Sequence, residues 1–390
     1  MLISFAVIML SGLFSGWLFK KIHLPSLFGM IISGIIIGPY VFDLIDVSVL
    51  DISADIRKIA LIIILLRAGL KLNIADLKKV GRPAILMCFL PACFEILGMF
   101  ILAPPLLNLS RLDALILGAV VGAVSPAVIV PRMIKLIDEG YGTKQGIPQM
   151  ILAGASVDDV FVIVMFTTFT SLAQGEKISV TSFVNIPISI FIGAIVGLLL
   201  AVILIFYFEN VQVNNTIKTI ILLSLSFILT YIEDSISLPF AALIAVMCLG
   251  IGIKDRKTEL AEILAQKYDE MWAAAEIFLF VSVGAAVAVD SLVNAGLNSV
   301  ILIFFVLLFR MAGVFVCLFK TELNIKEKLF CMIAYTPKAT VQAAIGSLPL
   351  AMGLSCGNIV LTVSVIAILV TAPLGAFGID LTYKKLLSKK

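Results

Sequence analysis

Two adjacent carboxylates, Asp158 and Asp159, lie in a stretch of sequence that is otherwise apolar enough to cross a lipid bilayer. A charged side chain at the centre of a membrane costs about 3 kcal/mol even on lenient insertion scales, so intramembrane acids mark ion or proton pathways. The structural alternative is an ion pair that only holds helices together. The pair predicts a path for protons or cations through this segment.

The composition places this chain among polytopic membrane proteins. Hydrophobic residues make up 61% of the sequence, charged residues 14%, and the mean hydropathy is +1.17. These values exclude an ordinary soluble domain. His23 is the single histidine of the sequence, and we do not expect it to form a His-based metal site or a Ser-His-Asp triad. We therefore expect neither an enzyme nor a cofactor. The six cysteines suggest no disulfide framework and are interpreted as packing residues.

Apolar runs long enough to span a bilayer predict an all-α protein with about thirteen transmembrane helices. The expected segments are 2–19, 27–45, 59–73, 83–107, 113–135, 147–172, 183–208, 217–232, 236–252, 271–289, 298–319, 328–353 and 358–380. The first is expected to be a retained helix rather than a signal peptide, because its nearby positive charges follow the apolar run instead of preceding it.

The distribution of Lys and Arg tests this topology. With the amino terminus outside, the loops and tail assigned to the inside hold 21 basic residues, among them Lys78, Lys79 and Lys390, and the outside loops hold four. The four are Arg57, Lys58, Arg111 and Lys177. Basic residues concentrate in cytoplasmic loops, so the count predicts a cytoplasmic carboxyl terminus. It also accounts for the net charge of +3, which gives no indication of a nucleic-acid partner.

A hydroxyl residue followed by proline occurs in the middle of two predicted spans, as Ser125-Pro126 and as Thr336-Pro337. Proline removes a backbone donor and clashes with the preceding turn, so each helix should bend or unwind there. Segments four to six enter the membrane from the inside, whereas segments eleven to thirteen enter from the outside. The two triplets therefore predict inverted repeats with two Pro-broken crossing helices, which is typical of secondary transporters. A simple kink is the alternative for each proline.

The charges that remain within the membrane can be matched in part. Arg310 has no local compensation, and in the repeat scheme segment eleven packs beside segment six, so its expected partner is Asp158 or Asp159. Adjacent helical residues point about 100° apart, so one aspartate can pair while the other faces the crossing point. Glu95, near the middle of segment four, requires a cationic or protonated partner. Arg67 and Glu276 lie toward segment ends and are interpreted as structural.

Five strings resemble sodium/proton antiporters of the cation-proton antiporter superfamily, and the likeness extends over nearly the whole chain. The strings are Ile64-Leu-Leu-Arg-Ala-Gly-Leu70, Val124-Ser-Pro-Ala-Val128 within 118–131, Ala155-Ser-Val-Asp-Asp159, Pro337-Lys-Ala-Thr-Val-Gln342 and Leu369-Val-Thr-Ala-Pro373. The Pro-Lys-Ala-Thr-Val-Gln string is the most specific. Within the superfamily the chain is most similar to the NHA-type branch, the bacterial relatives of animal sodium/hydrogen exchangers of the B subfamily.

This resemblance implies an NhaA/NapA-like antiporter fold in a single transporter unit, 1–390, in a bacterial inner membrane. A core domain built from repeats 83–172 and 298–380 would move like an elevator against dimerisation or scaffold helices in 1–73 and 183–289. A homodimer is implied, formed outside the two triplets. Gly29, Gly34 and Gly38 of segment two, and segments eight to ten, are possible contacts, although such glycines equally serve packing within one chain.

The resemblance also implies roles for individual residues. Asp159 would bind the transported sodium or lithium ion in exchange for protons, and Asp158 would form a salt bridge with Arg310, which stands where electrogenic relatives have lysine. Lys338 would offset the partial negative charge at a helix carboxyl end in the second broken segment. Glu95 resembles a polar membrane residue of the NHA-type branch. Ser125 and Ser156 could add oxygen ligands for a hard cation.

The sequence leaves the stoichiometry and part of the substrate question open. One site shared by proton and cation couples the two ions. Exchange would be electroneutral if Asp158 stays paired with Arg310, whereas two protons per cation are possible if that bridge breaks. A potassium/proton antiporter on the same fold is the main alternative function. An intramembrane aspartyl protease is remote, because it needs aspartates on two helices, and a sensor or structural protein would not need Pro-broken repeats around charges.

Overall fold

A computed structural model describes residues 1–22, 24–72, 81–175, 180–235 and 240–389, and within these ranges it does not describe the side chains of residues 156, 180–187, 234 and 289–295. The described backbone forms helices and contains no β-strand. Several residues used in the sequence predictions lie outside the described set. They are His23, Lys78, Lys79, Lys177, Lys390 and the side chain of Ser156.

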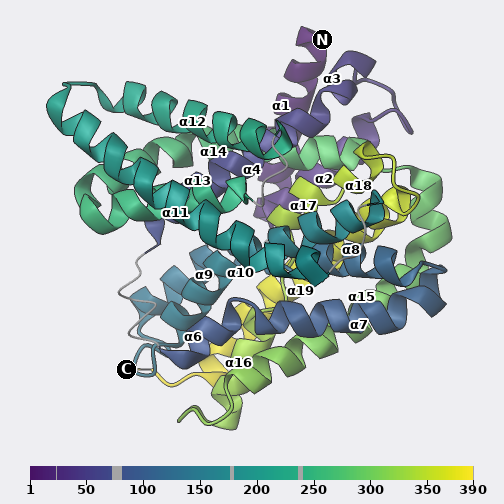
Figure 1. Ribbon diagram of the computed structural model, residues 1–390. Helices are drawn as coiled ribbons and strands as arrows, with labels where there is room; N and C mark the ends of the chain where they lie inside the picture. Colours follow the sequence, from purple (N-terminus) through teal and green to yellow (C-terminus); the bar gives the residue numbers. More distant parts are fainter. Residues whose placement is uncertain (23, 73–80, 176–179, 236–239, 390) are drawn as a thin grey trace. The chain divides into compact units, whose positions relative to one another are not determined.

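The described helices are labelled in chain order in Figure 1. Their bounds are α1 Leu2–Lys21, α2 Ser26–Ile37, α3 Val47–Asp51, α4 Ser53–Lys71, α6 Arg82–Met87, α7 Leu90–Leu107, α8 Arg111–Val121, α9 Pro126–Glu139, α10 Ile147–Ala173, α11 Val180–Asn210, α12 Asn215–Ser235, α13 Ala242–Arg256, α14 Thr258–Ala285, α15 Val289–Cys317, α16 Ile325–Ala334, α17 Thr340–Ile345, α18 Leu348–Ala351 and α19 Gly357–Leu386.

Eight helical stretches in the described chain are long and apolar enough to cross a membrane. They are Leu2–Lys21, Arg82–Leu107, Arg111–Glu139, Ile147–Ala173, Ile188–Asn210, Asn215–Glu233, Gly296–Cys317 and Gly357–Leu386. Each coincides with one of the thirteen predicted spans. The other five predictions fall on helices that are shorter, interrupted or more highly charged, and the number thirteen stays a prediction.

Two predicted spans end or break earlier than their apolar runs suggested. Segment two, predicted over 27–45, is helical only to Ile37, because Gly38 adopts an extended conformation before Pro39 and a residue before proline disfavours the helical region. Segment four, predicted over 83–107, is divided at residues 88–89 into α6 and α7. Proline is tolerated in the first turn of a helix, and Pro91 stands in the first turn of α7.

Contacts divide the chain into two compact units. Unit 1 consists of 1–57, 76–174 and 277–390, and unit 2 consists of 58–75 and 175–276. Unit 1 therefore holds both predicted repeats together with the amino-terminal helices. The division of roles into a moving core and a dimerisation scaffold stays a prediction.

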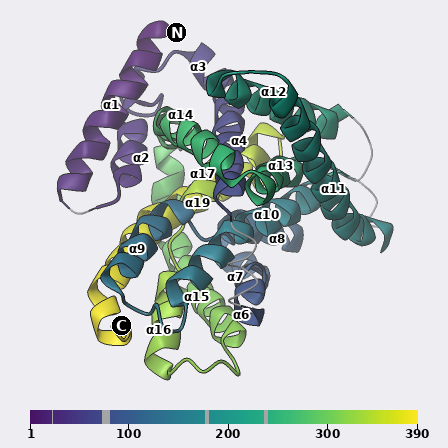
Figure 2. The same cartoon turned by 90° about the vertical axis from the view of Figure 1, so that its left-hand side faces the viewer.

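In unit 1, α7 lies along α15, and both lie side by side in Figure 1. The paired helices α1 and α2, coloured purple, are seen in Figure 2. The contact between α7 and α15 corrects one expectation, because segment eleven was predicted to pack beside segment six. Instead α15 packs mainly along segment four, and Arg310 of α15 forms an ion pair with Asp158 of α10.

In unit 2, α11 and α13 pack so closely that two positions on α11 require glycine. A Cβ atom added to Gly193 would lie 2.4 Å from the carbonyl oxygen of Ala241, and one added to Gly197 would lie 2.2 Å from that of Ala245. Small residues four apart let helix backbones approach in this way. Any larger residue would push α11 and α13 apart.

The three glycines of segment two serve packing within the chain. A Cβ atom on Gly29 would lie 2.5 Å from the Ser15 carbonyl oxygen, and one on Gly34 would lie 2.1 Å from the Val281 carbonyl oxygen. Gly38 is similarly close to Ala285. Of the two uses that the sequence left open for these glycines, contact within one chain is the one observed, and they offer no support for a dimer interface.

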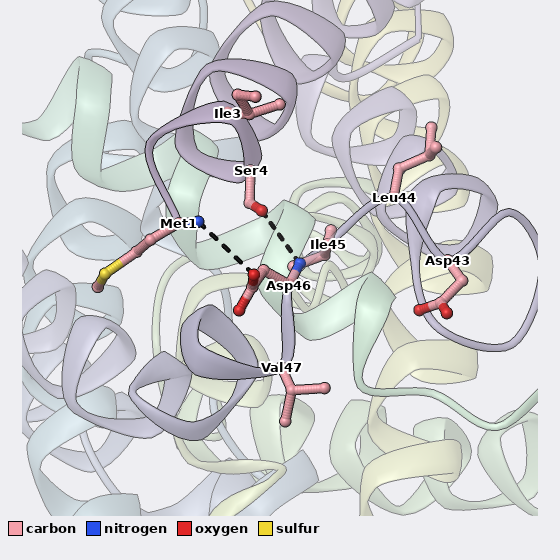
Figure 3. Close-up of a pocket in the computed structure, with 8 residues that line it drawn as sticks. All are labelled: Met1, Ile3, Ser4, Asp43, Leu44, Ile45, Asp46 and Val47. Atoms are coloured by element: carbon pink, nitrogen blue, oxygen red, sulfur yellow. Dashed lines mark hydrogen bonds and ion pairs between the residues drawn. The ribbon is translucent and has the colours of Figure 1, made fainter.

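A surface pocket lies where the turn after α2 approaches α1 (Figure 3). It is lined by Met1, Ile3, Ser4, Asp43, Leu44, Ile45, Asp46 and Val47. The backbone amide of Asp46 donates to the Ser4 hydroxyl at 3.0 Å, and the Asp46 carboxylate caps α3 by accepting from the Ser48 amide at 2.9 Å. This pocket shares no residue with the buried charges of unit 1.

Candidate ion-binding site

Two helix interruptions in unit 1 adjoin or contain the Ser125-Pro126 and Thr336-Pro337 pairs, and the first of these lies at residues 122–125, between α8 and α9. Pro126 begins α9, where its missing backbone donor is least costly, and Ser125 before it is extended. The backbone amide of Val124 donates to the Asp158 carboxylate at 2.8 Å, and that of Ser125 donates to the carbonyl oxygen of Pro337 at 2.8 Å. The groups freed by the interruption therefore find partners on other elements.

The second interruption lies at residues 335–339, between α16 and α17, and contains Pro337. The Tyr335 carbonyl oxygen accepts from the Arg310 Nε at 2.6 Å, and the backbone amide of Lys338 donates to the Thr371 hydroxyl of α19 at 2.9 Å. Together with the bond from Ser125 to Pro337, these contacts join the two interruptions directly. Pro126 directly follows the first non-helical stretch and Pro337 lies within the second, while the two Pro-broken crossing helices stay a prediction.

Asp158, on α10, is completely buried and accepts two hydrogen bonds at the same oxygen. The donors to Oδ2 are the Val124 amide, at 2.8 Å, and the Arg310 Nη2, at 2.7 Å. An ion pair between Arg310 and one of the two aspartates was predicted from the sequence, and this contact confirms it. The other oxygen, Oδ1, is buried and has no partner among the described residues.

Arg310 reaches both interruptions from α15 with one guanidinium group. Its Nε donates to Tyr335 in the second interruption, and its Nη1 donates to the carbonyl oxygen of Gly122 in the first. The remaining contacts are with the carboxylates of Asp158 and Glu95. A planar group with five donors suits such a position, which a point-like ammonium could not satisfy.

Glu95, on α7, is 1% exposed and accepts from two cations. Its Oε2 lies 2.7 Å from the Arg310 Nη1 and 2.5 Å from the Lys338 Nζ. The predicted cationic partner of Glu95 is therefore present twice. For Lys338 the family resemblance implied only a role beside a helix end, and the pairing of its ammonium with Glu95 was not predicted.

These four side chains, Glu95, Asp158, Arg310 and Lys338, form what we call the charged cluster. All are at most 1% exposed, and the two carboxylates balance the two cations. Buried charges persist where they are paired and hydrogen-bonded, because desolvation of an unpaired ion costs several kcal/mol. The charged cluster therefore joins three helices, α7, α10 and α15, to the second interruption without leaving a net charge of its own.

Asp159 follows Asp158 on α10 and stands outside these ion pairs. It is 6% exposed, and its Oδ1 is buried without a partner among the described residues. The buried hydroxyl of Ser125 likewise has no partner there. Two hard oxygen atoms without partners are suited to a cation such as sodium. No described contact tests Ser156 as a further ligand.

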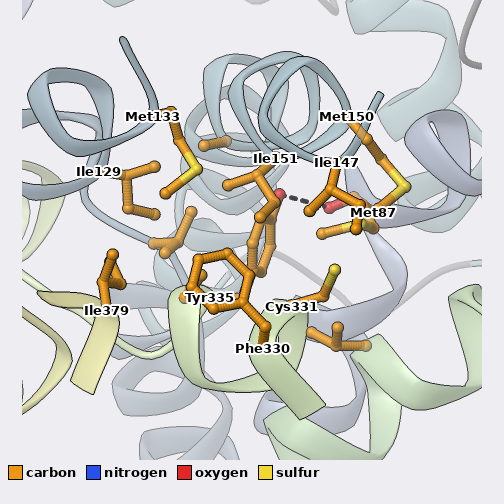
Figure 4. Close-up of a cluster of buried hydrophobic side chains, with 14 of the residues drawn as sticks. Met87, Ile129, Met133, Ile147, Met150, Ile151, Phe330, Cys331, Tyr335 and Ile379 are labelled. Atoms are coloured by element: carbon orange, nitrogen blue, oxygen red, sulfur yellow. Dashed lines mark hydrogen bonds between the residues drawn. The ribbon is translucent and has the colours of Figure 1, made fainter. Parts of the chain in front are cut away.

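A cluster of buried hydrophobic side chains packs around Tyr335, the first residue of the second interruption (Figure 4). Phe330, Cys331 and Tyr335 pack against Ile147 and Ile151 of α10. The Tyr335 hydroxyl donates to the Met87 carbonyl oxygen at 2.9 Å, which anchors the end of α16 to α6.

The cysteines agree with their interpretation as packing residues. All six are free, with Cys88, Cys317, Cys331 and Cys356 buried and Cys93 and Cys248 partly buried. No disulfide joins any of them.

Two buried contributors to the site were missed by sequence reasoning. Gln342, on α17, donates to the carbonyl oxygens of Val121 and Ala123, at 3.2 and 2.9 Å. Thr371, on α19, accepts from the Lys338 amide. Gln342 ends the Pro-Lys-Ala-Thr-Val-Gln string that carried the family resemblance, which was the available signal for it. Thr371 lies within another of these strings, Leu369-Val-Thr-Ala-Pro373, which was the signal available for it.

A helical membrane protein with buried charges gathered where two helices are interrupted belongs to the class of ion-coupled secondary transporters. The comparisons with known proteins make this class specific. Residues 6–385 match the family described as "Sodium/hydrogen exchanger, transmembrane". The chain belongs to the sodium/hydrogen exchanger family, whose members are transporters rather than enzymes and for which the exchanged ions are substrates rather than cofactors.

Individual relatives cover most of the chain. Sodium/hydrogen exchanger 9B2 of Homo sapiens is 34% identical over 384 residues, which cover 94% of this chain and 70% of that protein. The 9B2 exchanger of Xenopus tropicalis is 33% identical over 405 residues, covering 98% and 74%. The sodium proton antiporter MjNhaP1 of Methanocaldococcus jannaschii has a TM-score of 0.85 and 20% identity, and the match covers 98% of this chain and 97% of that one. At this identity the structural likeness establishes the fold alone.

Proposed function

We propose that this protein exchanges sodium or lithium ions for protons and that Asp159 carries both ions in turn. The observation that carries the proposal is the contrast between two neighbouring carboxylates. Each carboxylate has a buried Oδ1 without a described partner, but the Oδ2 of Asp158 is held by Arg310 and by the Val124 amide, whereas no hydrogen bond or ion pair is described for Asp159. Asp159 is therefore the carboxylate free to bind a proton or a cation.

Competition at one carboxylate couples the two ions. Asp159 neutralised by a proton or by sodium can pass through a low-dielectric barrier, whereas the empty carboxylate is too costly to move. Arg310 donates to four different acceptors, so we infer that the bridge to Asp158 persists through the cycle. Exchange would then be one proton for one cation and electroneutral.

The finer architecture belongs to this proposal. We infer thirteen spans in which repeats 83–172 and 298–380 are related by inversion, with the interruptions at 122–125 and 335–339 as the two broken crossing helices. The hydrogen bond between Ser125 and Pro337 supports this arrangement, because it joins the interruptions at equivalent places. Alternating access would follow from elevator movement of the repeats against the remaining helices.

The cellular setting is likewise inferred. The distribution of basic residues supports an amino terminus outside and a carboxyl terminus in the cytoplasm. We propose a homodimer in a bacterial inner membrane, with the interface formed by helices other than the two repeats.

Proton flux in proteoliposomes tests the function. Purified wild type and Asp159→Asn are each challenged with sodium, lithium and potassium while internal pH is followed with a dye. Asp269→Asn is a matched control, because Asp269 belongs to unit 2 and is 38% exposed. We expect sodium- and lithium-driven flux in wild type and control and none in Asp159→Asn. A response to potassium alone would show that the protein is a potassium/proton antiporter, the alternative function on the same fold. Undiminished flux in Asp159→Asn would exclude Asp159 as the ion carrier.

A further inference from the structure

Five backbone groups of residues 121–125, at the first interruption, are described with a partner from another element. The partners are Gln342 for the carbonyls of Val121 and Ala123, Arg310 for the carbonyl of Gly122, Asp158 for the amide of Val124, and the carbonyl of Pro337 for the amide of Ser125. Three of these contacts involve charged groups or the other interruption. Gln342 supplies the other two and is neutral.

Gln342 is completely buried on α17, and its orientation is determined by chemistry. Only the amide NH2 group can donate to a carbonyl oxygen, so Nε2 must face Val121 and Ala123. Its own oxygen, Oε1, is left without a partner among the described residues. The side chain therefore serves as a double donor between the second interrupted segment and the first.

We propose that Gln342 is a positioning residue of the cation site, whose two donors fix the stretch that presents Val124 to Asp158 and the Ser125 hydroxyl to the ion. The inference rests on the proposed function, since it concerns the geometry of the same site. Gln342 acts through the backbone of residues 121–125 and need not contact the ion.

The same two hydrogen bonds influence which cation fits. Backbone carbonyl oxygens are good ligands for hard cations, and those of Val121 and Ala123 are engaged by Gln342. While they are engaged, the ion depends on Asp159 and Ser125. Without Gln342, the carbonyls of Val121 and Ala123 become free oxygen ligands on a less rigid stretch of chain. We therefore expect the affinity of the site for each alkali cation, and its selectivity among them, to change more than the turnover number kcat.

The test compares three variants in proteoliposomes. Gln342→Leu removes both donors at similar volume, and Gln342→Glu keeps the shape but donates only when protonated. Gln149→Leu is the matched control, because Gln149 is a partly buried glutamine of α10 that is outside both interruptions. Flux is measured over a range of sodium, lithium and potassium concentrations to separate KM from kcat.

For Gln342→Leu we expect the KM for sodium to rise about tenfold, the size of effect that loss of one or two net hydrogen bonds produces. The ratio of lithium to sodium KM should also shift, while kcat changes less. Gln149→Leu should match wild type in all three quantities. An unchanged KM and an unchanged selectivity ratio in Gln342→Leu would overturn the proposal.

The pH dependence of exchange by Gln342→Glu tests hydrogen bonding separately from packing, because a change in packing alone would not depend on pH. A protonated carboxyl can donate one hydrogen bond to the interruption, whereas a carboxylate repels both carbonyl oxygens. Exchange by this variant, taken relative to wild type at each pH, should therefore recover as the pH falls. This arm decides the question even if Gln342→Leu does not fold, and a relative rate that is independent of pH would overturn the proposal.

Asp159→Asn, measured in parallel, separates the two levels of inference. Loss of flux in Asp159→Asn together with wild-type behaviour of the Gln342 variants would remove the positioning role and leave the proposed function intact. Normal flux in Asp159→Asn would remove the proposed function itself, and with it the site that Gln342 is proposed to position.

Discussion

Two places in this molecule bring an arginine and a lysine to one carboxylate. In unit 1, Arg310 and Lys338 both contact Glu95, and all three side chains are at most 1% exposed. In unit 2, Arg67 and Lys71 both contact Asp269, and these side chains are 27%, 47% and 38% exposed. Both groups contain an arginine, a lysine and one shared carboxylate, so they differ mainly in burial. The buried group is suited to a transport site, whereas the exposed group links two helices at a surface.

The energetics of the two groups should differ accordingly. Exposed ion pairs contribute about 0–1 kcal/mol, because water and salt screen them. Removing one member of a buried pair costs about 3–5 kcal/mol, because the charge left behind has no compensation. A buried group is therefore sensitive to each member, whereas the exposed group tolerates losses.

Arg310→Met should produce the largest effect on stability. The substitution leaves the carboxylates of Asp158 and Glu95 short of a cation and strips donors from the carbonyls of Gly122 and Tyr335. We expect destabilisation of at least about 3 kcal/mol and loss of exchange, checked by thermal unfolding in detergent and by flux. Arg310→Lys, which keeps the charge but not the planar donors, should recover only part of the stability. A Met variant that melts with wild type would contradict a structural role for the charged cluster.

Glu95→Gln should be the next most disruptive change. Arg310 and Lys338 then face each other across a neutral amide, and we expect a loss of about 3 kcal/mol. Adding Lys338→Gln restores the charge balance with Asp158 and Arg310, so the double variant should be more stable than Glu95→Gln alone. The coupling is measured by a double-mutant cycle of unfolding free energies. Strict additivity would show that Glu95 and Lys338 do not interact.

Asp269→Asn should have only a small effect on stability, because its ion-pair group is exposed. The ion pairs with Arg67 and Lys71 are lost, but these side chains remain hydrated, so we expect no more than about 1 kcal/mol of destabilisation, decreasing with added salt. Exchange should continue at the wild-type rate. A loss comparable to that of Glu95→Gln would show that burial is not the property that distinguishes the two groups.

We expect the smallest effect for Asp46, a carboxylate whose side chain is 52% exposed. Hydrogen bonds from the Ser48 hydroxyl and then from its amide lower the pKa of Asp46 below its ordinary value of 3.8. A lowered pKa in the folded state stabilises above the unfolded pKa, and this contribution disappears as the pH falls through the folded value. Thermal unfolding of wild type below pH 4 should therefore lose a small increment that Asp46→Asn lacks throughout. Parallel acid profiles for the two proteins would refute the contribution.

The sequence could predict the contacts that charge burial makes obligatory. Arg310 had no local compensation, so a partner on another helix was required, and Asp158 provides it. Glu95 needed a cation for the same reason. The exposed pair of Arg67 with Asp269 was not predicted, since a charge near water has no required partner.

Other features depend on tertiary geometry. Lys338 lies 243 positions from Glu95, and the sequence offered no reason to prefer this carboxylate to the aspartates. Gln342 carries no charge, so its burial did not demand a partner until the interruption at 122–125 was seen. Apolar runs located the helices well but overran α2, because the run continues through Gly38 and Pro39 where the backbone leaves the helix.

Proton release on sodium binding tests the central claim most directly. Purified protein in weakly buffered solution is titrated with sodium chloride while a dye records the pH, at a pH where the binding carboxyl is protonated. Because a metal ligand must lose its proton, a single shared carboxylate predicts one proton released per sodium ion bound by wild type and none by Asp159→Asn. Release that persists in Asp159→Asn, or two protons per sodium ion in wild type, would contradict exchange at Asp159 with a permanent bridge between Asp158 and Arg310.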